Sequence, residues 1–270
     1  MSTPIESVQS VNPPAIAGVP LDQRHAIVVG ASSGMGAALV RQLAGEGYRV
    51  VALARRQKEL EGLAKSCEDA CKETGGVVLI RQHDVLDTDA VPTMFEELVR
   101  ELGGLDLMIF AAGIMPTVEP DEYNTEKDLA MMSVNIGGCI AWCNPAANYF
   151  KSKRSGTIVG ISSIAGDRGR RGAPVYGTSK AAMNTYLEAL RNRLGESGVH
   201  VCTIKPGFID TAMTQGLEGL FWVIGPEEAA GTILSAARNR VNTRYVPLRW
   251  QLVGTIIKLI PSFIFKKLNL

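Results

Sequence analysis

The sequence predicts a single α/β domain built on a doubly wound parallel sheet with helices on both faces. Two observations predict it: short, continuous apolar runs of strand length recur along the chain, and helical stretches lie between them. Continuous apolar runs are typical of strands that are buried on both faces. Their alternation with helices is typical of a parallel sheet with right-handed crossover connections. No linker or internal repeat interrupts the pattern, so one domain is expected over residues 24–247.

The expected elements follow one another in this alternation. The expected strands are residues 26–30, 48–53, 77–80, 105–110, 156–161, 199–204 and 244–247. The expected helices are residues 34–46, 55–74, 89–102, 125–151 and 174–196. An amphipathic C-terminal segment, residues 248–270, follows the last expected strand.

Composition excludes several classes of protein. The 270 residues are 46% hydrophobic and carry a net charge of +1, which excludes a disordered chain with low hydrophobicity and high charge. The balanced charge gives no overall positive field for a polyanion, so nucleic acid is not an expected partner. The 28 glycines exceed the usual share and indicate that backbone comes close to a ligand or to another segment.

The N-terminal residues and the cysteines indicate a reducing compartment. Residues 1–18 are polar and lack the basic and apolar regions of an export signal, so a flexible tail over residues 1–23 of a cytoplasmic protein is expected. The cysteines and the three histidines offer no set of four ligands at metal-binding spacing, and no metal site is expected. The cysteines are interpreted as small buried apolar residues: Cys67, Cys71, Cys139, Cys143 and Cys202.

The first expected strand runs directly into a glycine-rich turn that is followed by an apolar helix. The glycines of the turn form the pattern G-x-x-x-G-x-G. The first allows a sharp turn off the strand, and the others leave room for a pyrophosphate at the helix N-terminus, where the helix dipole favours anions. A Rossmann-type fold with a dinucleotide cofactor is therefore expected. Its contacts in the turn are Gly30, Ser32, Ser33, Gly34, Met35 and Gly36.

The end of the second expected strand distinguishes between the two nicotinamide cofactors. A carboxylate at this position accepts hydrogen bonds from the adenosine ribose of NAD(H). The sequence has Arg55 and Arg56 there instead. A guanidinium pairs with a 2′-phosphate, so NADP(H) is favoured over NAD(H). Arg55 is the expected contact, assisted by the hydroxyls of Ser32 and Ser33.

A tyrosine and a lysine four residues apart lie in the first turns of the expected helix 174–196. This spacing places Tyr176 and Lys180 on one face of the helix. A phenol has a pKa near 10, and a positive charge about 4 Å away stabilises its anion by roughly 4 kcal/mol at an effective dielectric constant of about 20. Lys180 is therefore expected to bring the pKa of Tyr176 into the range of a general acid or base. Ser162 and Ser163 end the fifth strand, at the sheet edge where parallel sheets carry their sites.

Together these motifs resemble the short-chain dehydrogenase/reductase family over about residues 25–247. The resemblance implies a catalytic tetrad of Asn135, Ser163, Tyr176 and Lys180, and the separation of 13 residues between serine and tyrosine favours Ser163 over Ser162. It also implies cofactor contacts after the third, fourth and sixth strands, at Asp84, Val85, Ala112, Gly113, Pro206, Gly207, Ile209 and Thr211. Tyr176 and Lys180 of the tetrad are implied cofactor contacts as well. One departure is the sequence Phe-Ala-Ala-Gly at residues 110–113, where the family has Asn-Asn-Ala-Gly.

The resemblance implies an NADP(H)-dependent oxidoreductase that interconverts a carbonyl and a secondary alcohol. In this mechanism Ser163 holds the substrate carbonyl, and Tyr176 donates the proton as hydride arrives at carbon. Lys180 lowers the pKa of Tyr176 and binds the nicotinamide ribose, and Asn135 supports a water that relays protons. The family usually pairs the helices that correspond to residues 125–151 and 174–196, so a homo-dimer or homo-tetramer is expected.

The expected substrate is a small carbonyl or alcohol of apolar or anionic character. Residues 212–224 are apolar and contain glycines, as in a lid over an apolar or lipid-bearing substrate. Arg168, Arg170 and Arg171 are interpreted as facing either an anionic substrate or solvent. With the C-terminal segment they resemble polyprenyl-phosphate keto-sugar reductases within the family. A lipid-linked keto-sugar or keto-acyl reductase at a membrane surface is therefore an alternative function.

The C-terminal segment, residues 248–270, has two interpretations. The segment combines apolar residues, Trp250 among them, with several basic residues, which is typical of an amphipathic helix in a membrane interface. The first interpretation is therefore peripheral membrane contact. A subunit interface or a cover for the sheet edge is the other. Pro261 ends the apolar run well short of the about 20 residues that span a membrane.

Two other classes of protein share part of the pattern. A non-catalytic NADP(H)-binding scaffold would keep the glycine turn but tolerate loss of the tetrad, which is complete here. A sugar-nucleotide epimerase or dehydratase shares the turn and the Tyr-x-x-x-Lys spacing, but needs a larger C-terminal substrate domain than the residues after Gly207 provide. An oxidoreductase is therefore the expected function.

Overall fold

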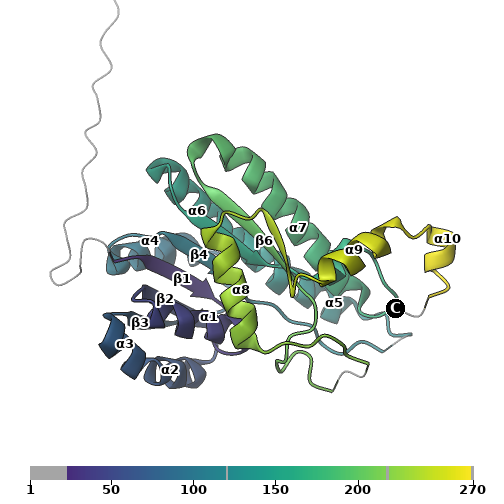
Figure 1. Ribbon diagram of the computed structural model, residues 1–270, viewed down its shortest axis with the longest axis horizontal. Helices are drawn as coiled ribbons and strands as arrows, with labels where there is room; N and C mark the ends of the chain where they lie inside the picture. Colours follow the sequence, from purple (N-terminus) through teal and green to yellow (C-terminus); the bar gives the residue numbers. More distant parts are fainter. Residues whose placement is uncertain (1–22, 120, 217–218, 269–270) are drawn as a thin grey trace, which may run out of the picture.

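The computed structural model describes residues 23–119, 121–216 and 219–268. Its centre is a parallel seven-stranded sheet with the strand order β3-β2-β1-β4-β5-β6-β7 (Figure 1). Helices lie on both faces of this sheet, so the predicted doubly wound α/β fold is confirmed. The expected tail, residues 1–23, lies outside the described residues except for Gln23, as do residues 217–218 of the expected lid.

The strands form where the sequence has its apolar runs. They are β1 (His25–Val29), β2 (Arg49–Ala54), β3 (Val77–Gln82), β4 (Leu107–Phe110), β5 (Thr157–Ile161), β6 (His200–Pro206) and β7 (Thr243–Val246). β4 and β6 are buried at every residue. Burial on both faces explains why these runs are continuous and do not alternate with polar residues.

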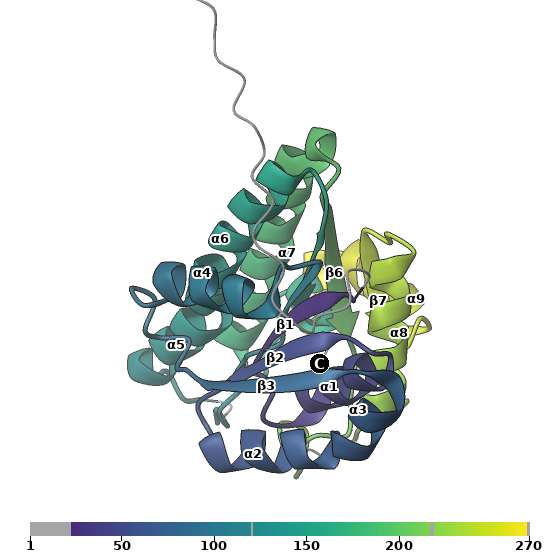
Figure 2. The same cartoon turned by 90° about the vertical axis from the view of Figure 1, so that its left-hand side faces the viewer.

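The helices divide between the two faces of the sheet. They are α1 (Gly34–Gly45), α2 (Gln57–Ser66), α3 (Glu68–Thr74), α4 (Val91–Leu102), α5 (Thr125–Met132), α6 (Gly138–Lys153), α7 (Pro174–Leu194), α8 (Pro226–Arg238), α9 (Trp250–Leu259) and α10 (Ser262–Phe265). Ala26 and Val28 of β1 face the core that α1 and α8 cover. Ile27 and Val29 face the core covered by α4, α6 and α7, seen on the other side of the sheet in Figure 2. Because strand side chains alternate, β1 supplies both cores.

Two of the expected helices are divided in the structure. The expected helix 55–74 begins at Gln57, and the buried Cys67 separates α2 from α3. The expected helix 125–151 is interrupted by a π-helical turn at Ser133–Gly137, between α5 and α6. A π turn takes in one extra residue without changing the apolar pattern much, so periodicity does not reveal it. The turn contains Asn135, one of the expected site residues.

Helix α8 was not among the expected helices. Its sequence has the ordinary signals of a helix start, with Pro226 in the first turn followed by Glu227 and Glu228. Its buried face consists mainly of small residues, with Ile233 and Leu234 as the larger ones. The structure places α8 against α1, where it completes one of the two cores.

The C-terminal segment forms α9 and α10, with Pro261 between them, and lies at the right of Figure 1. Arg168, in the segment between β5 and α7, holds it in place. The guanidinium donates to the carbonyl oxygens of Ile257 at 2.8 Å and Ile260 at 2.5 Å, at the end of α9, and lies 4.2 Å from the centre of the Phe265 ring. Among the described residues, no helix is long and apolar enough to cross a membrane.

Replacing Arg168 with Ala is expected to loosen this segment. The substitution leaves the last carbonyls of α9 without their charged donor, which should lower the free energy of unfolding by about 2 kcal/mol. Amide hydrogen exchange should speed up in α9 and α10 more than in the sheet. Arg171→Ala is the matched control, because Arg171 is exposed. Equal exchange rates in the two variants would contradict the assigned contact.

The strand order places a topological switch point between β1 and β4. From β1 the chain proceeds outward to β2 and β3, and from β4 it proceeds outward in the other direction. The connections that leave the carboxyl ends of these two strands therefore diverge. Ligands of open α/β sheets bind in the crevice that such divergence opens.

Candidate active site

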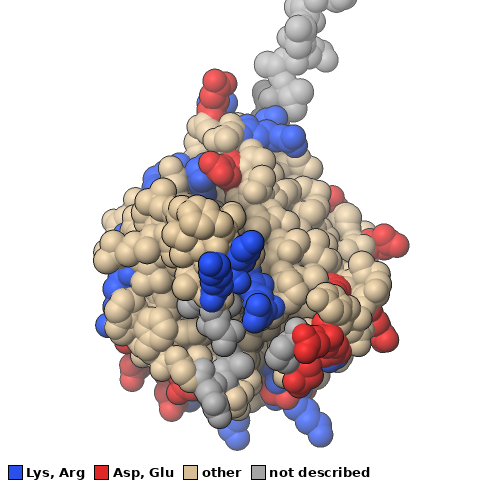
Figure 3. Space-filling model, turned by 90° about the vertical axis from the view of Figure 1, so that its right-hand side faces the viewer, with Lys and Arg blue, Asp and Glu red and all other residues tan. Residues whose placement is uncertain are grey.

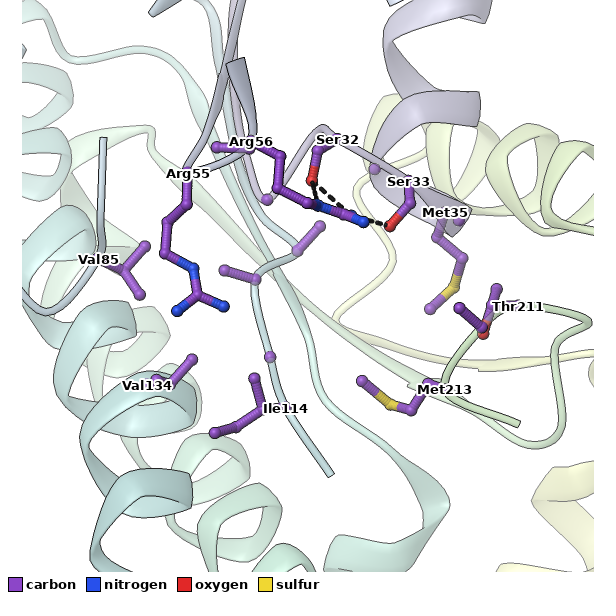
Figure 4. Close-up of a pocket in the computed structure, with 18 of the residues that line it drawn as sticks. Ser32, Ser33, Met35, Arg55, Arg56, Val85, Ile114, Val134, Thr211 and Met213 are labelled. Carbon is purple, nitrogen blue, oxygen red and sulfur yellow. Dashed lines mark hydrogen bonds between the residues drawn. The ribbon is translucent and has the colours of Figure 1, made fainter. Parts of the chain in front are cut away.

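A cleft of about 370 Å³ lies at this switch point (Figure 4). Many of the expected cofactor contacts line it: Gly30, Ser32, Ser33, Gly34, Met35, Gly36, Arg55, Val85, Ala112, Gly113 and Thr211. The cleft also has lining residues that were not among the expected contacts: Ala54, Arg56, His83, Ala111, Ile114, Val134, Ala212 and Met213. Its volume is in the range of small-molecule sites.

The glycine turn forms one wall of the cleft because side chains would not fit there. Gly30 has φ +91°, and a Cβ atom on it would lie 2.4 Å from the backbone nitrogen of Ala112. A Cβ atom on Gly36 would lie 2.1 Å from the carbonyl oxygen of Gly30. The turn ends at the N-terminus of α1, which has no acidic residue in its first turn. The free amides and the helix dipole at this end favour an anion.

The two arginines after β2 take different positions from those expected. Arg56, and not Arg55, contacts the hydroxyls of the turn, at 2.8 Å from Ser32 Oγ and 2.7 Å from Ser33 Oγ. Arg55 lies apart from these serines in Figure 4 and pairs loosely with Asp84 at 3.8 Å. Both guanidiniums line the cleft. The expectation that the serines assist Arg55 is therefore wrong, since they bind its neighbour.

The segment after β3 contributes one expected contact and one unexpected contact. Val85 lines the cleft, whereas Asp84 does not and instead accepts a hydrogen bond from the backbone of Leu86. The buried His83 also lines the cleft, and its ring packs edge-on against Trp142 at 5.4 Å. Burial lowers the pKa of His83, so this wall is uncharged near neutral pH.

Three of the expected catalytic residues come together beyond the inner end of the cleft. The side chain of Ser163 is hydrogen-bonded with that of Tyr176. The ammonium of Lys180 lies 5.8 Å from the centre of the tyrosine ring and donates to the carbonyl oxygen of Ile161 at 2.9 Å. Ser162 points elsewhere, because its hydroxyl donates to the backbone carbonyl of Lys180.

The pKa of Tyr176 is raised, whereas the sequence predicted that Lys180 would lower it. Burial raises it above the ordinary value of tyrosine, and the hydrogen bond with Ser163 and the charge of Arg170 act against this rise. Burial also lowers the pKa of Lys180 to about 8. In the protein by itself, Tyr176 is therefore a protonated phenol at neutral pH, which is the form that donates a proton.

Asn135 joins the cleft to the catalytic residues. Its side-chain amide accepts a hydrogen bond from the backbone nitrogen of Ile114 at 2.8 Å and donates to Ser179 Oγ at 3.0 Å. A Cβ atom on Gly113 would lie 3.3 Å from the Asn135 amide oxygen and 3.5 Å from Lys180 Nζ. Gly113 therefore lies between the cleft and both side chains and has no side chain of its own to separate them.

The residues at the end of β6 and in the loop that follows it lie in different surroundings. Thr211 lines the cleft, next to Gly34. The carbonyl oxygen of Pro206 accepts a weak hydrogen bond from Ser163 Oγ at 3.5 Å. Ile209 is buried and pairs with Ile224. A Cβ atom on Gly207 would lie 2.1 Å from the indole nitrogen of Trp250, so α9 packs directly on this loop.

The three arginines between Ser163 and α7 have different surroundings. Arg168 binds the end of α9, and Arg171 is exposed. Arg170 is partly buried, and its charge acts on the ionisation of Tyr176. Of these three arginines, Arg170 is the one whose charge acts on the tyrosine, and the sequence showed it only as one member of the run Asp-Arg-Gly-Arg-Arg.

The residues of the cleft fit a dinucleotide cofactor. The glycine turn leaves backbone amides open to a pyrophosphate, and two guanidiniums lie at the end of β2. Apolar side chains of Val85, Ile114 and Val134 offer flat contacts for rings. Among the described residues, no group of His, Cys, Asp and Glu is arranged to hold a metal ion.

Comparisons with known proteins agree with this geometry. A family model described as short chain dehydrogenase matches residues 24–219. An uncharacterized oxidoreductase of Myxococcus xanthus is 35% identical over 194 residues, which are 72% of this chain and 75% of that protein. Another, from Staphylococcus saprophyticus, is 31% identical over 237 residues, which are 86% of this chain and 99% of that protein.

A solved structure has the same fold. The structure of a short-chain type dehydrogenase/reductase from Mycobacterium ulcerans matches this chain with a TM-score of 0.77. The match covers 91% of this chain and 98% of that protein's chain. At 21% sequence identity this likeness concerns the fold alone. The expected similarity of the C-terminal half to polyprenyl-phosphate keto-sugar reductases is not shown by these comparisons.

Proposed function

Because the chain belongs to the short-chain dehydrogenase/reductase family, we propose that it is an NADP(H)-dependent oxidoreductase that interconverts a carbonyl and a secondary alcohol, with Tyr176 as the acid or base. The family implies a nicotinamide cofactor. One observation carries the proposal: Gly113 lines the cleft, and the side chains of Lys180 and Asn135 lie directly behind it. A cofactor in the cleft would therefore end beside the catalytic residues.

The chain's own residues would bind and polarise the carbonyl. Ser163 and Tyr176 share a hydrogen bond, so a carbonyl oxygen placed between them would receive two hydroxyl donors. The nicotinamide, when bound, supplies the hydride. Tyr176 then transfers its proton to the oxygen, and the charge of Lys180 stabilises the phenolate that remains. Asn135 is held by Ile114 and Ser179 and would fix the position of a water between the backbone and Lys180.

The protonated state of Tyr176 favours the reductive direction. Burial raises the pKa of its phenol, so the group is a proton donor at neutral pH in the protein without cofactor. Oxidation of an alcohol would require the phenolate instead. We therefore propose carbonyl reduction as the favoured direction, because Tyr176 already carries the proton that this direction requires.

NADP(H) is proposed over NAD(H) because of the charge at the end of β2. Arg55 and Arg56 line the cleft there. Arg56 is already oriented by the hydroxyls of Ser32 and Ser33, which reduces the cost of ordering it around a phosphate. We propose Arg56 as the main contact of the 2′-phosphate and Arg55 as the second.

The character of the substrate and the assembly belong to the same proposal. Arg170 beside Tyr176 supports an anionic group on the substrate, and the exposed Phe221 and Trp222 of the lid support an apolar part. We propose a homo-dimer or homo-tetramer through α5, α6 and α7, where Leu129 and Ile140 are exposed. Peripheral contact with a membrane is proposed for α9 and α10.

The test is oxidation of NADPH with a panel of ketones, aldehydes and keto-acyl thioesters, together with lipid-linked keto sugars. At least one carbonyl class should be reduced, with NADPH preferred to NADH. Tight NADPH binding without reduction of any member of the panel would instead favour a non-catalytic scaffold.

The pH dependence of reduction should follow Lys180. Burial lowers its pKa to about 8, so its charge is present below pH 8 and is lost as the pH rises through that value. The pH profile of kcat/KM reports ionisations of the free enzyme. It should be level below about pH 8 and fall by about tenfold per pH unit above it. A profile that stays level to pH 10 would contradict this role.

A further inference from the structure

Helix α9 has one face buried in the protein and one face open to solvent. Trp250 and Gly254 are buried on the inner face. On the outer face, Leu252 is 67% exposed and Leu259 is 77% exposed, with Ile256 between them. In α10, Phe263 is 66% exposed. These exposed side chains of α9 and α10, with Ile264, are called the C-terminal face below.

The C-terminal face is held in a fixed orientation by polar contacts on its inner side. Asp167 binds Lys258 of α9 at 3.0 Å and Lys205 of β6 at 2.5 Å, and it accepts a hydrogen bond from Tyr245. Its side chain is only 2% exposed. With Arg168 at the end of α9, these contacts prevent the helix from turning its apolar side inward. The exposure of large apolar residues is therefore a property of the fold and needs a partner to explain it.

Two aromatic residues of the expected lid pack against the start of α9. The rings of Phe221 and Trp222 lie 4.9 Å and 5.5 Å from that of Trp250, on the inner face of α9. Both lid residues are also exposed. Trp250 in turn packs on Gly207, in the loop that follows β6. Phe221 and Trp222 are thus exposed apolar residues at the start of α9, beside the loop that follows β6.

Basic residues border the C-terminal face. Residues 229–270 contain no Asp or Glu and seven Lys and Arg. Figure 3 shows Lys and Arg side chains gathered in the middle of the side of the molecule that carries α9 and α10, with acidic residues mainly toward its edges. Lys266 and Lys267 are exposed at the end of α10, and Arg249 stacks on Trp222 at the start of α9.

We propose that the C-terminal face is a docking surface for an anionic membrane. An apolar helix face that is bordered by lysines and carries a tryptophan-containing edge matches the headgroup and acyl layers of such a surface. A second copy of the chain fits less well, because two-fold pairing of this face would bring its basic residues together without any acidic partner from residues 229–270. The occupant is therefore a lipid surface with negative headgroups.

Docking in this way would turn the lid toward the bilayer. Resting on the proposed function, this orientation assigns the substrate to amphiphilic carbonyl compounds that reside in the membrane and enter beneath Phe221 and Trp222. The docking itself requires no turnover, so the two proposals can fail separately.

The experiment is co-sedimentation of the full chain with vesicles of phosphatidylcholine alone or mixed with phosphatidylglycerol, at low and high salt. One variant, Leu252→Glu with Ile256→Glu, removes the apolar contact, and Lys65→Glu on α2 is its control with the same change of net charge. The second variant, Lys266→Glu with Lys267→Glu, removes the basic contact. Its control is Lys65→Glu with Lys72→Glu, whose lysines are exposed on α2 and α3. NADPH binding of every variant confirms its fold.

The chain should bind vesicles that contain phosphatidylglycerol, less so at high salt, and bind phosphatidylcholine alone weakly. Each of the two variants should lose about tenfold or more of its partitioning, while the controls keep it. Equal recovery of wild type in the supernatant with and without vesicles would overturn the proposal. So would dissociation of an oligomer by Leu252→Glu with Ile256→Glu in size-exclusion chromatography, because that result assigns the face to a second copy. Loss of NADPH-dependent reduction with vesicle binding intact would count against the proposed function only.

Discussion

Replacing Tyr176 with Phe should lower kcat for carbonyl reduction by about 10²- to 10⁴-fold. The substitution removes the hydroxyl that donates the proton and leaves the ring in place. Tyr176 is not among the residues that line the cofactor cleft, so the dissociation constant of NADPH should change little. Steady-state rates with the best carbonyl of the panel and a fluorescence titration with NADPH measure the two quantities.

The adjacent serines provide a matched control for this result. Ser163 shares a hydrogen bond with Tyr176, whereas the hydroxyl of Ser162 binds the backbone of Lys180. Ser163→Ala removes one hydrogen-bond donor to the substrate carbonyl and should therefore lower kcat by about 10²-fold or more. Ser162→Ala should lower it far less. Turnover of Tyr176→Phe close to that of wild type would contradict the assignment of the proton donor.

Replacing Arg56 with Ala should reduce the preference for NADPH over NADH. A charge-assisted hydrogen bond to a phosphate contributes about 1.5–3 kcal/mol, so kcat/KM for NADPH should fall by about 10- to 100-fold. The value for NADH should change little, because NADH lacks the 2′-phosphate. Measuring kcat/KM with both cofactors at a saturating carbonyl concentration gives the ratio directly.

Arg55→Ala is the comparison that tests the geometry. Arg55 pairs only loosely with Asp84 and does not contact the serines of the turn. Its loss should therefore have the smaller effect on the cofactor ratio. A larger effect from Arg55→Ala than from Arg56→Ala would show that Arg55 is the main contact of the 2′-phosphate, as the sequence predicted. An unchanged ratio in both variants would contradict the proposed preference for NADP(H).

The fold could be predicted from the sequence because its strands are buried on both faces. Each strand is a continuous apolar run, and the glycine turn marks the first strand–helix junction. The structure and the family comparison confirm both the parallel sheet and the family. Helix α8 was not predicted although its sequence carries a helix-start signal, Pro226 followed by Glu227 and Glu228, and an apolar face.

The site could be predicted only where a residue's role is set by its place along the chain. Gly36 is required by a contact within its own turn, with the carbonyl oxygen of Gly30, and the glycine pattern of the sequence shows it. Arg56 was missed because the direction of a side chain after a strand depends on which hydroxyls it meets in space. The raised pKa of Tyr176 was missed for a similar reason, since burial opposes the effect expected from Lys180 and sequence spacing does not reveal burial.

The central claim is that this chain transfers hydride from a nicotinamide cofactor to a carbonyl carbon with proton donation by Tyr176. The most direct measurement uses NADPH that carries deuterium at the transferring position of the nicotinamide, followed by mass spectrometry of the alcohol. Wild type should place one deuterium on the carbinol carbon, and Tyr176→Phe should leave the carbonyl unlabelled. Tight binding of labelled NADPH with no deuterium in any product of wild type would contradict the account.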